Sequence, residues 1–299
     1  MRTDSLHKRP QLQHIVAAVF CLFLFFFSAP SLAKDSITWM EVNMPPYMIQ
    51  SGPYKDQGYG DVVERLIQAQ LPEYEHHRLY TNVVRHFDMF KRGDKVCSVG
   101  LYRTPERESF LHFSIPSLLT MPAVLIIRVD KRQQFGGGKS CSLVELLRDE
   151  KFRLGFSKDR SYGKILDMEL HKYADRANLI RFSGQELGEN YYRMLMLDRL
   201  DGLLGLPDEA VYRAEKMGIR DQIATVMLKE NQESYEEWFC SIACPKNQWG
   251  GEIIDKINHV LVQIRPSESY RQAYERWLDT NNLQRYREIY NKIFLATKP

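Results

Sequence analysis

Residues 101–116 of this chain read Leu-Tyr-Arg-Thr-Pro-Glu-Arg-Glu-Ser-Phe-Leu-His-Phe-Ser-Ile-Pro. A Thr-Pro-Glu turn signal at residues 104–106 is followed directly by Arg107. A guanidinium presents a planar fork of donors that matches a carboxylate, which the point charge of a lysine does not. Arg107 is therefore a candidate to bind an anionic group. The alternative is that Arg107 caps a helix end or pairs on the surface with Glu106 or Glu108.

The same segment resembles the ligand-arginine segment of the family 3 periplasmic solute-binding proteins, the polar amino acid binders of ABC transporters. Arg107 follows Thr-Pro-Glu, and Phe-Ser-x-Pro begins six residues later, at Phe113. In that family the arginine holds the carboxylate of the ligand, and Phe-Ser-x-Pro leads into a strand that crosses to a second lobe. The resemblance implies that Thr104 and Arg107 belong to a ligand-binding site.

Further landmarks of the family follow in order along nearly the whole chain after residue 33. They are Pro45-Pro46-Tyr47, Gly58, Ser161-Tyr162-Gly163, Leu200-Asp201-Gly202 and Lys256-Ile257-Asn258. The resemblance implies an α/β chain with the two-lobed fold of periplasmic binding proteins. Each lobe is then a mostly parallel sheet flanked by helices, and two strands form the hinge between the lobes.

The residues themselves also predict alternating strands and helices, which is typical of parallel sheets. Expected strands are 37–42, 76–80, 96–101, 152–156, 179–182, 200–204 and 238–245. Expected helices follow Asp61 and Gly163 and cover 83–91, 142–148, 191–197, 253–264 and 269–278. With crossings at 122–129 and 223–228, lobe 1 comprises residues 34–124 and 227–299, and lobe 2 comprises residues 125–226.

The first 33 residues have the features of a secretory signal peptide. A basic segment with Arg2, Lys8 and Arg9 precedes an apolar run at 15–27, and small residues at 31–33 predict cleavage after Ala33. We expect release into the periplasm, and the alternative is an uncleaved anchor. Cleavage leaves 266 of the 299 residues and lowers the net charge from +3 to about +1. Because no basic block stands out, we expect no nucleic acid partner.

Four cysteines remain after residue 33: Cys97, Cys141, Cys240 and Cys244. In an oxidising compartment they can form bridges, with three possible full pairings. Cys240 and Cys244 lie in one expected strand, too far apart to bond each other, so we expect Cys97 to bond one of them. Neither a Cys-x2-Cys pair nor suitable histidine spacing occurs, and we expect no structural metal and no cofactor.

For lobe 2, the resemblance implies that the helix start at Ser161, Tyr162 and Gly163 meets the anionic group of the ligand. It also implies that Asp201, at a strand end, holds an ammonium group, and Tyr47 is a candidate to stack on the apolar part of the ligand. The alternatives are an N-cap for Ser161, a strand-end turn for Asp201 and ordinary packing for Tyr47.

One departure from the family pattern concerns the ligand class. After Gly202 the chain continues Leu203-Leu204-Gly205-Leu206, without the aspartate that polar amino acid binders often carry there. The expected function is a monomeric periplasmic protein that captures a small anionic or zwitterionic, amino acid-like solute for an ABC importer, without catalysis. The alternatives are an enzyme built on this scaffold and a ligand-sensing partner of a membrane receptor.

Overall fold

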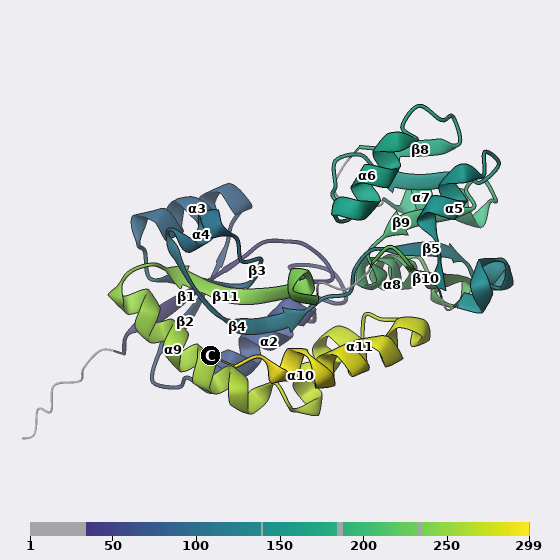
Figure 1. The fold of residues 1–299 in the computed structure, drawn as a ribbon. Coiled ribbons are helices and arrows are strands. Elements are labelled where there is room, and N and C mark those ends of the chain that lie inside the picture. The colour runs from purple at the N-terminus through teal and green to yellow at the C-terminus, as the bar shows by residue number, and fades with distance from the viewer. Residues whose placement is uncertain (1–33, 139, 184–187, 232–234, 299) are drawn as a thin grey trace, which may run out of the picture.

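The computed structural model describes residues 34–138, 140–183, 188–231 and 235–298. They form two lobes, each built on one β-sheet with helices packed on it (Figure 1). The two-lobed α/β fold predicted from the sequence is therefore confirmed. The expected leader and its cleavage site lie mostly in residues 1–33, outside the described residues. Every described helix is too short or too polar to span a membrane.

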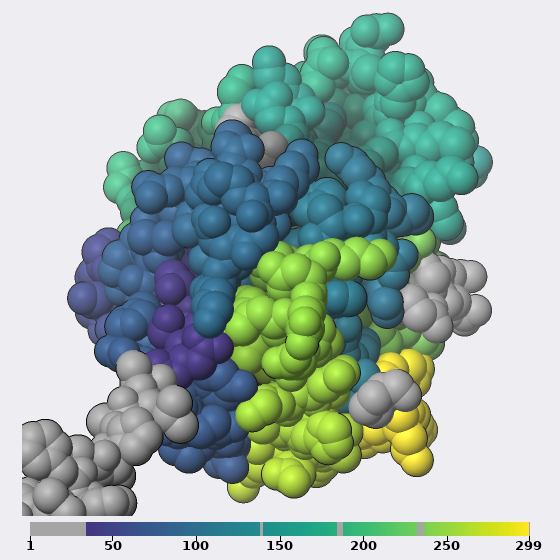
Figure 2. All heavy atoms as spheres, turned by 90° about the vertical axis from the view of Figure 1, so that its left-hand side faces the viewer, coloured from purple at the N-terminus to yellow at the C-terminus, as the bar shows by residue number. Residues whose placement is uncertain are grey.

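The sheet of lobe 1 has the strand order β2-β1-β3-β11-β4 in the described residues. The strands are β1 (Ser36–Glu41), β2 (Glu75–Tyr80), β3 (Val96–Leu101), β4 (Leu111–Leu119) and β11 (Phe239–Pro245). β1 pairs in parallel with β2 and β3, whereas β11 pairs antiparallel with β3 and β4. The predicted parallel unit is thus present, and the chain that returns from lobe 2 completes the sheet. Figure 2 shows this green C-terminal segment packed directly against the purple and blue N-terminal part.

Helices cover the sheet of lobe 1. They are α2 (Tyr59–Gln68), α3 (Val83–Arg92), α4 (Pro105–Glu108), α9 (Gln248–Ile264), α10 (Glu268–Glu275) and α11 (Thr280–Lys292), with short 3-10 turns η3 (Tyr235–Trp238) and η4 (Phe294–Ala296). α2 begins before Asp61, whose carboxylate accepts from the backbone N–H of Gly58 at 2.9 Å and of Ile49 at 3.0 Å. The apolar faces of α2, α9 and α10 bury a core around Trp39 and Trp277.

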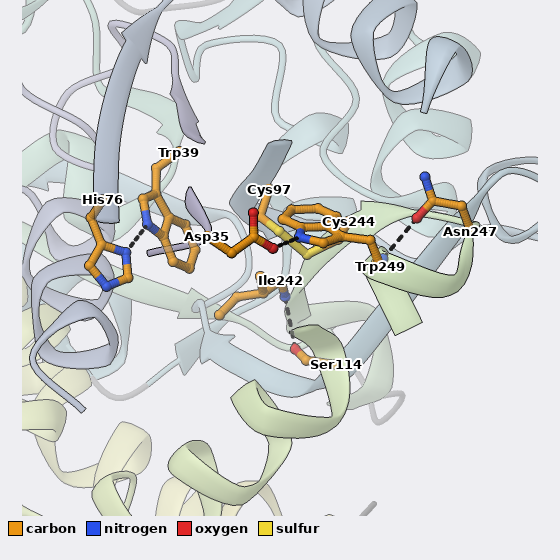
Figure 3. Close-up of a disulfide and its surroundings, with 10 residues drawn as sticks. Asp35, Trp39, His76, Cys97, Ser114, Ile242, Cys244, Asn247 and Trp249 are labelled. Atoms are coloured by element: carbon orange, nitrogen blue, oxygen red, sulfur yellow. Dashed lines mark hydrogen bonds between the residues drawn. A yellow bond between two sulfur atoms is a disulfide. The ribbon is translucent and has the colours of Figure 1, made fainter. Parts of the chain in front are cut away.

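A disulfide between Cys97 and Cys244 joins β3 to β11 (Figure 3). The prediction that Cys97 bonds Cys240 or Cys244 is confirmed, while Cys141 and the buried Cys240 are free thiols. Beside the bridge, Trp249 at the start of α9 donates its indole N–H to Asp35 at 3.0 Å (Figure 3). This bond ties the residue that precedes β1 to the start of α9.

The sheet of lobe 2 has the order β6-β10-β5-β9-β7-β8 in the described residues. The elements are β5 (Val124–Arg128), η1 (Val129–Gly138), β6 (Ser140–Cys141), α5 (Leu143–Arg148), β7 (Leu154–Ser157), α6 (Lys164–Lys172), β8 (Leu179–Phe182), α7 (Glu189–Met196), β9 (Gly202–Gly205), α8 (Pro207–Lys216), η2 (Arg220–Gln222) and β10 (Ile223–Leu228). β7 pairs in parallel with β8 and β9, and β5 pairs antiparallel with β9 and β10.

The crossings differ from the prediction. The segments 122–129 and 223–228 were expected to cross, but they largely form β5 and β10, which pair with each other inside the sheet of lobe 2. The connections are the short segments 120–123 and 229–238, the latter outside the described residues at 232–234. They meet where Thr120 donates its backbone N–H and its hydroxyl to the Trp238 carbonyl, at 3.0 and 3.2 Å.

Two helices that the sequence analysis did not predict, α8 and α11, connect the lobes. α11 of lobe 1 lies against β10 of lobe 2 (Figure 1). Asp279, the N-cap of α11, accepts from the backbone N–H and the hydroxyl of Thr225 on β10, at 2.9 and 2.6 Å. From α8, Tyr212 packs into the core of lobe 1, and its ring centroid lies 5.5 Å from that of Trp277.

Candidate functional site

A cavity of about 590 Å³ lies between the lobes. Lobe 1 contributes Tyr102, and lobe 2 contributes the segment 160–166 and Leu206. The connecting segments complete the lining with Thr120, Met121, Pro122, Ala123, Glu230, Asn231, Glu237 and Trp238. Both lobes and both connections thus share one cavity.

The sheet topology explains why these residues meet. Tyr102 follows β3 and Thr120 follows β4, whereas residues 160–166 and Leu206 come after the parallel strands β7 and β9. Because the carboxyl ends of parallel strands lie at one edge of a sheet, the loops after β7 and β9 are adjacent, and open α/β sheets bind ligands at this edge.

The predicted residues Ser161, Tyr162 and Gly163 all line the cavity. Asp167, in the first turn of α6, accepts from the Ser161 hydroxyl and from the Tyr162 backbone N–H, the latter at 2.8 Å. The Tyr162 hydroxyl accepts from the Ser157 N–H at 2.8 Å, which holds its buried ring against the end of β7. Gly163 is the N-cap of α6, with a φ of 107° that disfavours any side chain there.

An ion pair that the sequence analysis missed lies in the wall of the cavity. The Arg160 guanidinium donates to both oxygens of Glu209 at 2.5 and 2.7 Å, and both side chains are largely buried. Burial disfavours the charge of Arg160, but the bonds to Glu209 outweigh it and hold the pKa of Arg160 above its ordinary value. The two residues are 49 positions apart, so only the folded chain brings them together.

Arg107 and Thr104 lie beside the cavity rather than in its wall. Thr104 caps α4 by accepting from the Arg107 backbone N–H at 3.3 Å. The Arg107 side chain donates to the carbonyl of Tyr102, a lining residue, at 2.7 Å and lies 5.0 Å from the ring centroid of Phe87. Within the described residues Arg107 makes no ion pair, and the alternative partner Glu108 binds Arg103 instead.

The structure does not bring Tyr47 into the lining of the cavity. The Tyr47 hydroxyl donates to the Val99 carbonyl, and its ring fills the space beside two glycines of lobe 1. A Cβ atom at Gly60 would lie 2.4 Å from a carbon of this ring, and one at Gly100 would lie 2.7 Å from the Tyr47 hydroxyl oxygen. These contacts correspond to the alternative of ordinary packing.

Asp201 lies at the opposite edge of the lobe 2 sheet. The expectation that it ends a strand is wrong, because β9 begins after it, at Gly202. Its carboxylate accepts from the Arg153 guanidinium at 2.9 and 3.0 Å and from the Arg153 backbone N–H at 2.8 Å. Burial opposes the charge, but these bonds hold the pKa of Asp201 below its ordinary value. The cavity end of β9 carries Leu206 instead.

Among the described residues, no three His, Cys, Asp or Glu side chains are arranged to hold a metal ion.

Comparisons with known proteins concern the fold. No protein-family model matches the sequence, and the curated proteins offer no match either. Among solved structures, the chain is similar to an ancestral cationic amino acid solute-binding protein, AncCDT-1, with a TM-score of 0.61 and 16% identity over 82% of this chain and 96% of that chain. A second similar structure concerns glutathione import via GshT and the cystine ABC importer TcyBC of Streptococcus mutans. It matches with a TM-score of 0.55 and 13% identity over 83% of this chain and 99% of that chain.

A third is an amino acid ABC transporter substrate-binding protein from Streptococcus pneumoniae Canada MDR_19A bound to L-arginine, with a TM-score of 0.53 and 16% identity over 82% and 93% of the chains. At such identities the likeness shows a shared fold, which is the two-lobed fold of solute-binding proteins.

Proposed function

We propose that this chain is a periplasmic solute-binding protein that captures a small anionic or zwitterionic solute between its lobes. The observation that carries the proposal is the cavity of about 590 Å³ whose wall is shared by both lobes and both connecting segments. A solute in such a cavity contacts both lobes at once, so its binding favours a closed arrangement by hinge motion. The similar structures named for amino acid binding support this role.

The proposal is a binding role without catalysis. Two carboxylates next to the cavity already have strong partners: Glu209 binds Arg160, and Glu230 accepts from Ser142, Leu143 and Val144 at the start of α5. A third, Glu237, is exposed to solvent, whereas catalytic carboxyl groups are tuned by burial and neighbouring groups. A general acid or base needs a titratable group free to exchange a proton with the substrate. Because Glu209 and Glu230 are already bound to neighbouring groups, neither is free to exchange a proton with a substrate. This supports a role in solute binding rather than in catalysis.

The test is a thermal-shift screen of the mature protein against amino acids, carboxylates and short peptides, followed by calorimetry. We expect at least one class to bind, and Ile165→Glu to weaken that binding at least about tenfold, because it places a negative charge in the cavity wall. Met168→Glu is the matched control, since Met168 is also an exposed residue of α6 but does not line the cavity. Equal effects of the two variants would place the site elsewhere.

We further propose that the bound solute is delivered to an ABC importer. The disulfide of the folded chain is consistent with an exported protein, because such bridges persist in oxidising compartments. Uptake of the labelled solute by cells with and without this chain tests the proposal. Unchanged uptake, together with a lost transcriptional response to the solute, would instead assign the chain to a membrane sensor.

A further inference from the structure

Apolar and aromatic side chains dominate one part of the cavity wall. They come from both lobes and both connecting segments: Tyr102, Met121, Ile165, Leu206 and Trp238. Tyr102 is 48% exposed and Ile165 is 46% exposed. Binding becomes more favourable when the apolar surface of a solute covers side chains of this size and removes them from water. The wall therefore favours a solute with an apolar body.

The carboxylates of the wall give an ammonium group little to bind. Glu230 accepts the Ser142 hydroxyl at 2.6 Å and two backbone N–H groups at 3.0 and 3.1 Å. These bonds outweigh the effect of burial and hold the pKa of Glu230 below its ordinary value. The negative charge of Glu230 is therefore already used to bind the groups at the start of α5. Glu237, the other acidic lining residue, is exposed, and an ion pair with an exposed group is weak.

The half-buried cation near the cavity differs from these carboxylates. Arg107, beside Tyr102, is only partly exposed and makes no ion pair within the described part of the chain. A carboxylate can therefore find an unpaired, partly shielded positive charge at Arg107, to which the exposed Lys164 in the wall of lobe 2 adds a weaker attraction. An ammonium group that leaves water without a counter-charge pays a large desolvation penalty.

We propose that the solute of this cavity is a carboxylate with an apolar or aromatic body and without an ammonium group. The inference rests on the proposed binding function and narrows its solute class from anionic or zwitterionic to anionic. Leu206, Ile165 and Trp238 then contact the body of the solute, and Lys164 with Arg107 attracts its carboxylate.

The test compares probes that share one body and differ in charge. The aromatic set has one phenyl body: 3-phenylpropionate carries only a carboxylate, L-phenylalanine carries a carboxylate and an ammonium group, and phenethylamine carries only an ammonium group. The aliphatic pair is 4-methylvalerate, with a carboxylate alone, and L-leucine, with both charges. By calorimetry on the mature protein, we expect each carboxylate to bind at least about tenfold more tightly than its amino acid, and phenethylamine not to bind. Tighter binding of the amino acids overturns this inference but leaves the proposed function standing. No binding by any probe or by any solute of the screen overturns both.

A variant tests the role of the wall directly. Ile165→Asp places a carboxylate in the cavity wall at a half-exposed position in the first turn of α6. We expect it to raise the affinity for L-phenylalanine relative to 3-phenylpropionate at least about tenfold. Ile165→Asn is the matched control, with the same shape and no charge. An unchanged preference in Ile165→Asp, compared with Ile165→Asn, contradicts the inference.

Discussion

Arg107 and Arg160 lie on opposite lobes and differ in what binds their guanidinium groups. Arg160 has a bidentate partner in Glu209, so its charge is neutralised within the wall. Arg107 donates to a backbone carbonyl and lies over the Phe87 ring, contacts that leave its positive charge uncompensated. Of the two, Arg107 is therefore the residue whose charge is available to an anionic solute.

We predict that Arg107→Ala weakens binding of the anionic solute by about tenfold to a hundredfold, because hydrogen bonds to charged groups contribute about 1.5–3 kcal/mol. Arg107→Lys restores part of the affinity, since it keeps the charge but lacks the planar fork. Calorimetry measures both. Arg103→Ala is the control, because Arg103 is an exposed residue of the same loop that pairs with Glu108. Unchanged affinity in Arg107→Ala would assign Arg107 a packing role.

A second residue-scale feature is a pair of buried carboxyl groups in lobe 1. Glu41 on β1 and Glu64 on α2 are 1% and 0% exposed, and both lie near the Arg78 guanidinium, at 3.0 and 3.5 Å. Burial and the neighbouring Glu41 raise the pKa of Glu64 to about 9. One arginine thus lies beside two buried acids, and burial favours the protonated form of Glu64.

This pair predicts a loss of stability in alkaline solution. A carboxyl whose pKa is raised on folding stabilises the protein fully below its unfolded pKa, and this contribution falls as pH rises towards about 9. The free energy of unfolding should decline between pH 5 and pH 9 by at most about 1.4 kcal/mol per pH unit for one group. Glu64→Gln should flatten this slope in urea melts. The exposed Glu73 provides the control variant Glu73→Gln, and equal slopes in both variants would refute the role of Glu64.

At the scale of elements, lobe 1 depends on the late return of β11 between β3 and β4. β11 is separated from its partners by the whole of lobe 2, and the Cys97–Cys244 bridge spans 147 residues. Such a long closed loop has a large conformational entropy in the reduced, unfolded chain. The disulfide therefore fixes the least local pairing of the sheet.

We predict that Cys97→Ala/Cys244→Ala lowers the free energy of unfolding by about 2–5 kcal/mol. Urea melts monitored by circular dichroism measure the loss. Cys141→Ala is the control, because Cys141 is a free and only partly buried thiol of lobe 2, and it should change stability by much less. A double variant as stable as wild type would mean that β11 needs no covalent link.

Individual helices and strands also show which parts of the fold can be predicted from the sequence. The strand at 179–182 and the helix from Val83 were placed correctly, because periodic apolar residues end at clear turn signals. α8 was missed although Pro207 stands in its first turn with two acids, a typical helix start. α11 was missed because its buried face carries Asn282, two tyrosines and only one aliphatic residue, Ile289.

The candidate site was predictable only where its residues lie next to a local turn or helix-start signal in the sequence. The segment 161–163 was placed correctly at a helix start beside the cavity, because a Gly after a strand marks the turn. Asp201 was assigned to the wrong edge of the sheet, since the run 200–204 does not reveal where β9 begins. The Arg160–Glu209 pair has no local signal, because its geometry arises only when β7 and β9 pair in the sheet.

For the whole molecule, the docking of α8 and β10 on the C-terminal helices links the lobes more firmly than the two connecting segments alone. The Tyr274 hydroxyl donates to the buried Asp208 at 3.2 Å and accepts from the Met121 N–H at 2.9 Å, where the first connection leaves lobe 1. Burial and the neighbouring Glu209 raise the pKa of Asp208 to about 7. The aromatic contacts of Tyr212 with Tyr54 and Trp277 lie in the same interface, at ring-centroid distances of 6.2 and 5.5 Å.

This arrangement predicts that Tyr212→Ala loosens lobe 1 although Tyr212 belongs to a helix of lobe 2. Removing its ring leaves a cavity against Trp277 and should cost about 3 kcal/mol. Hydrogen exchange reports the stability of each segment separately, so amide protection should fall in the loop around Tyr54 and in α10 as well as in α8. Tyr192→Ala removes an equally large buried ring from the interior of lobe 2 and should lower protection in lobe 2 alone. If the two variants gave the same exchange pattern, the lobes would be independent units joined only by their connections, and solute binding would have to close them without support from this interface.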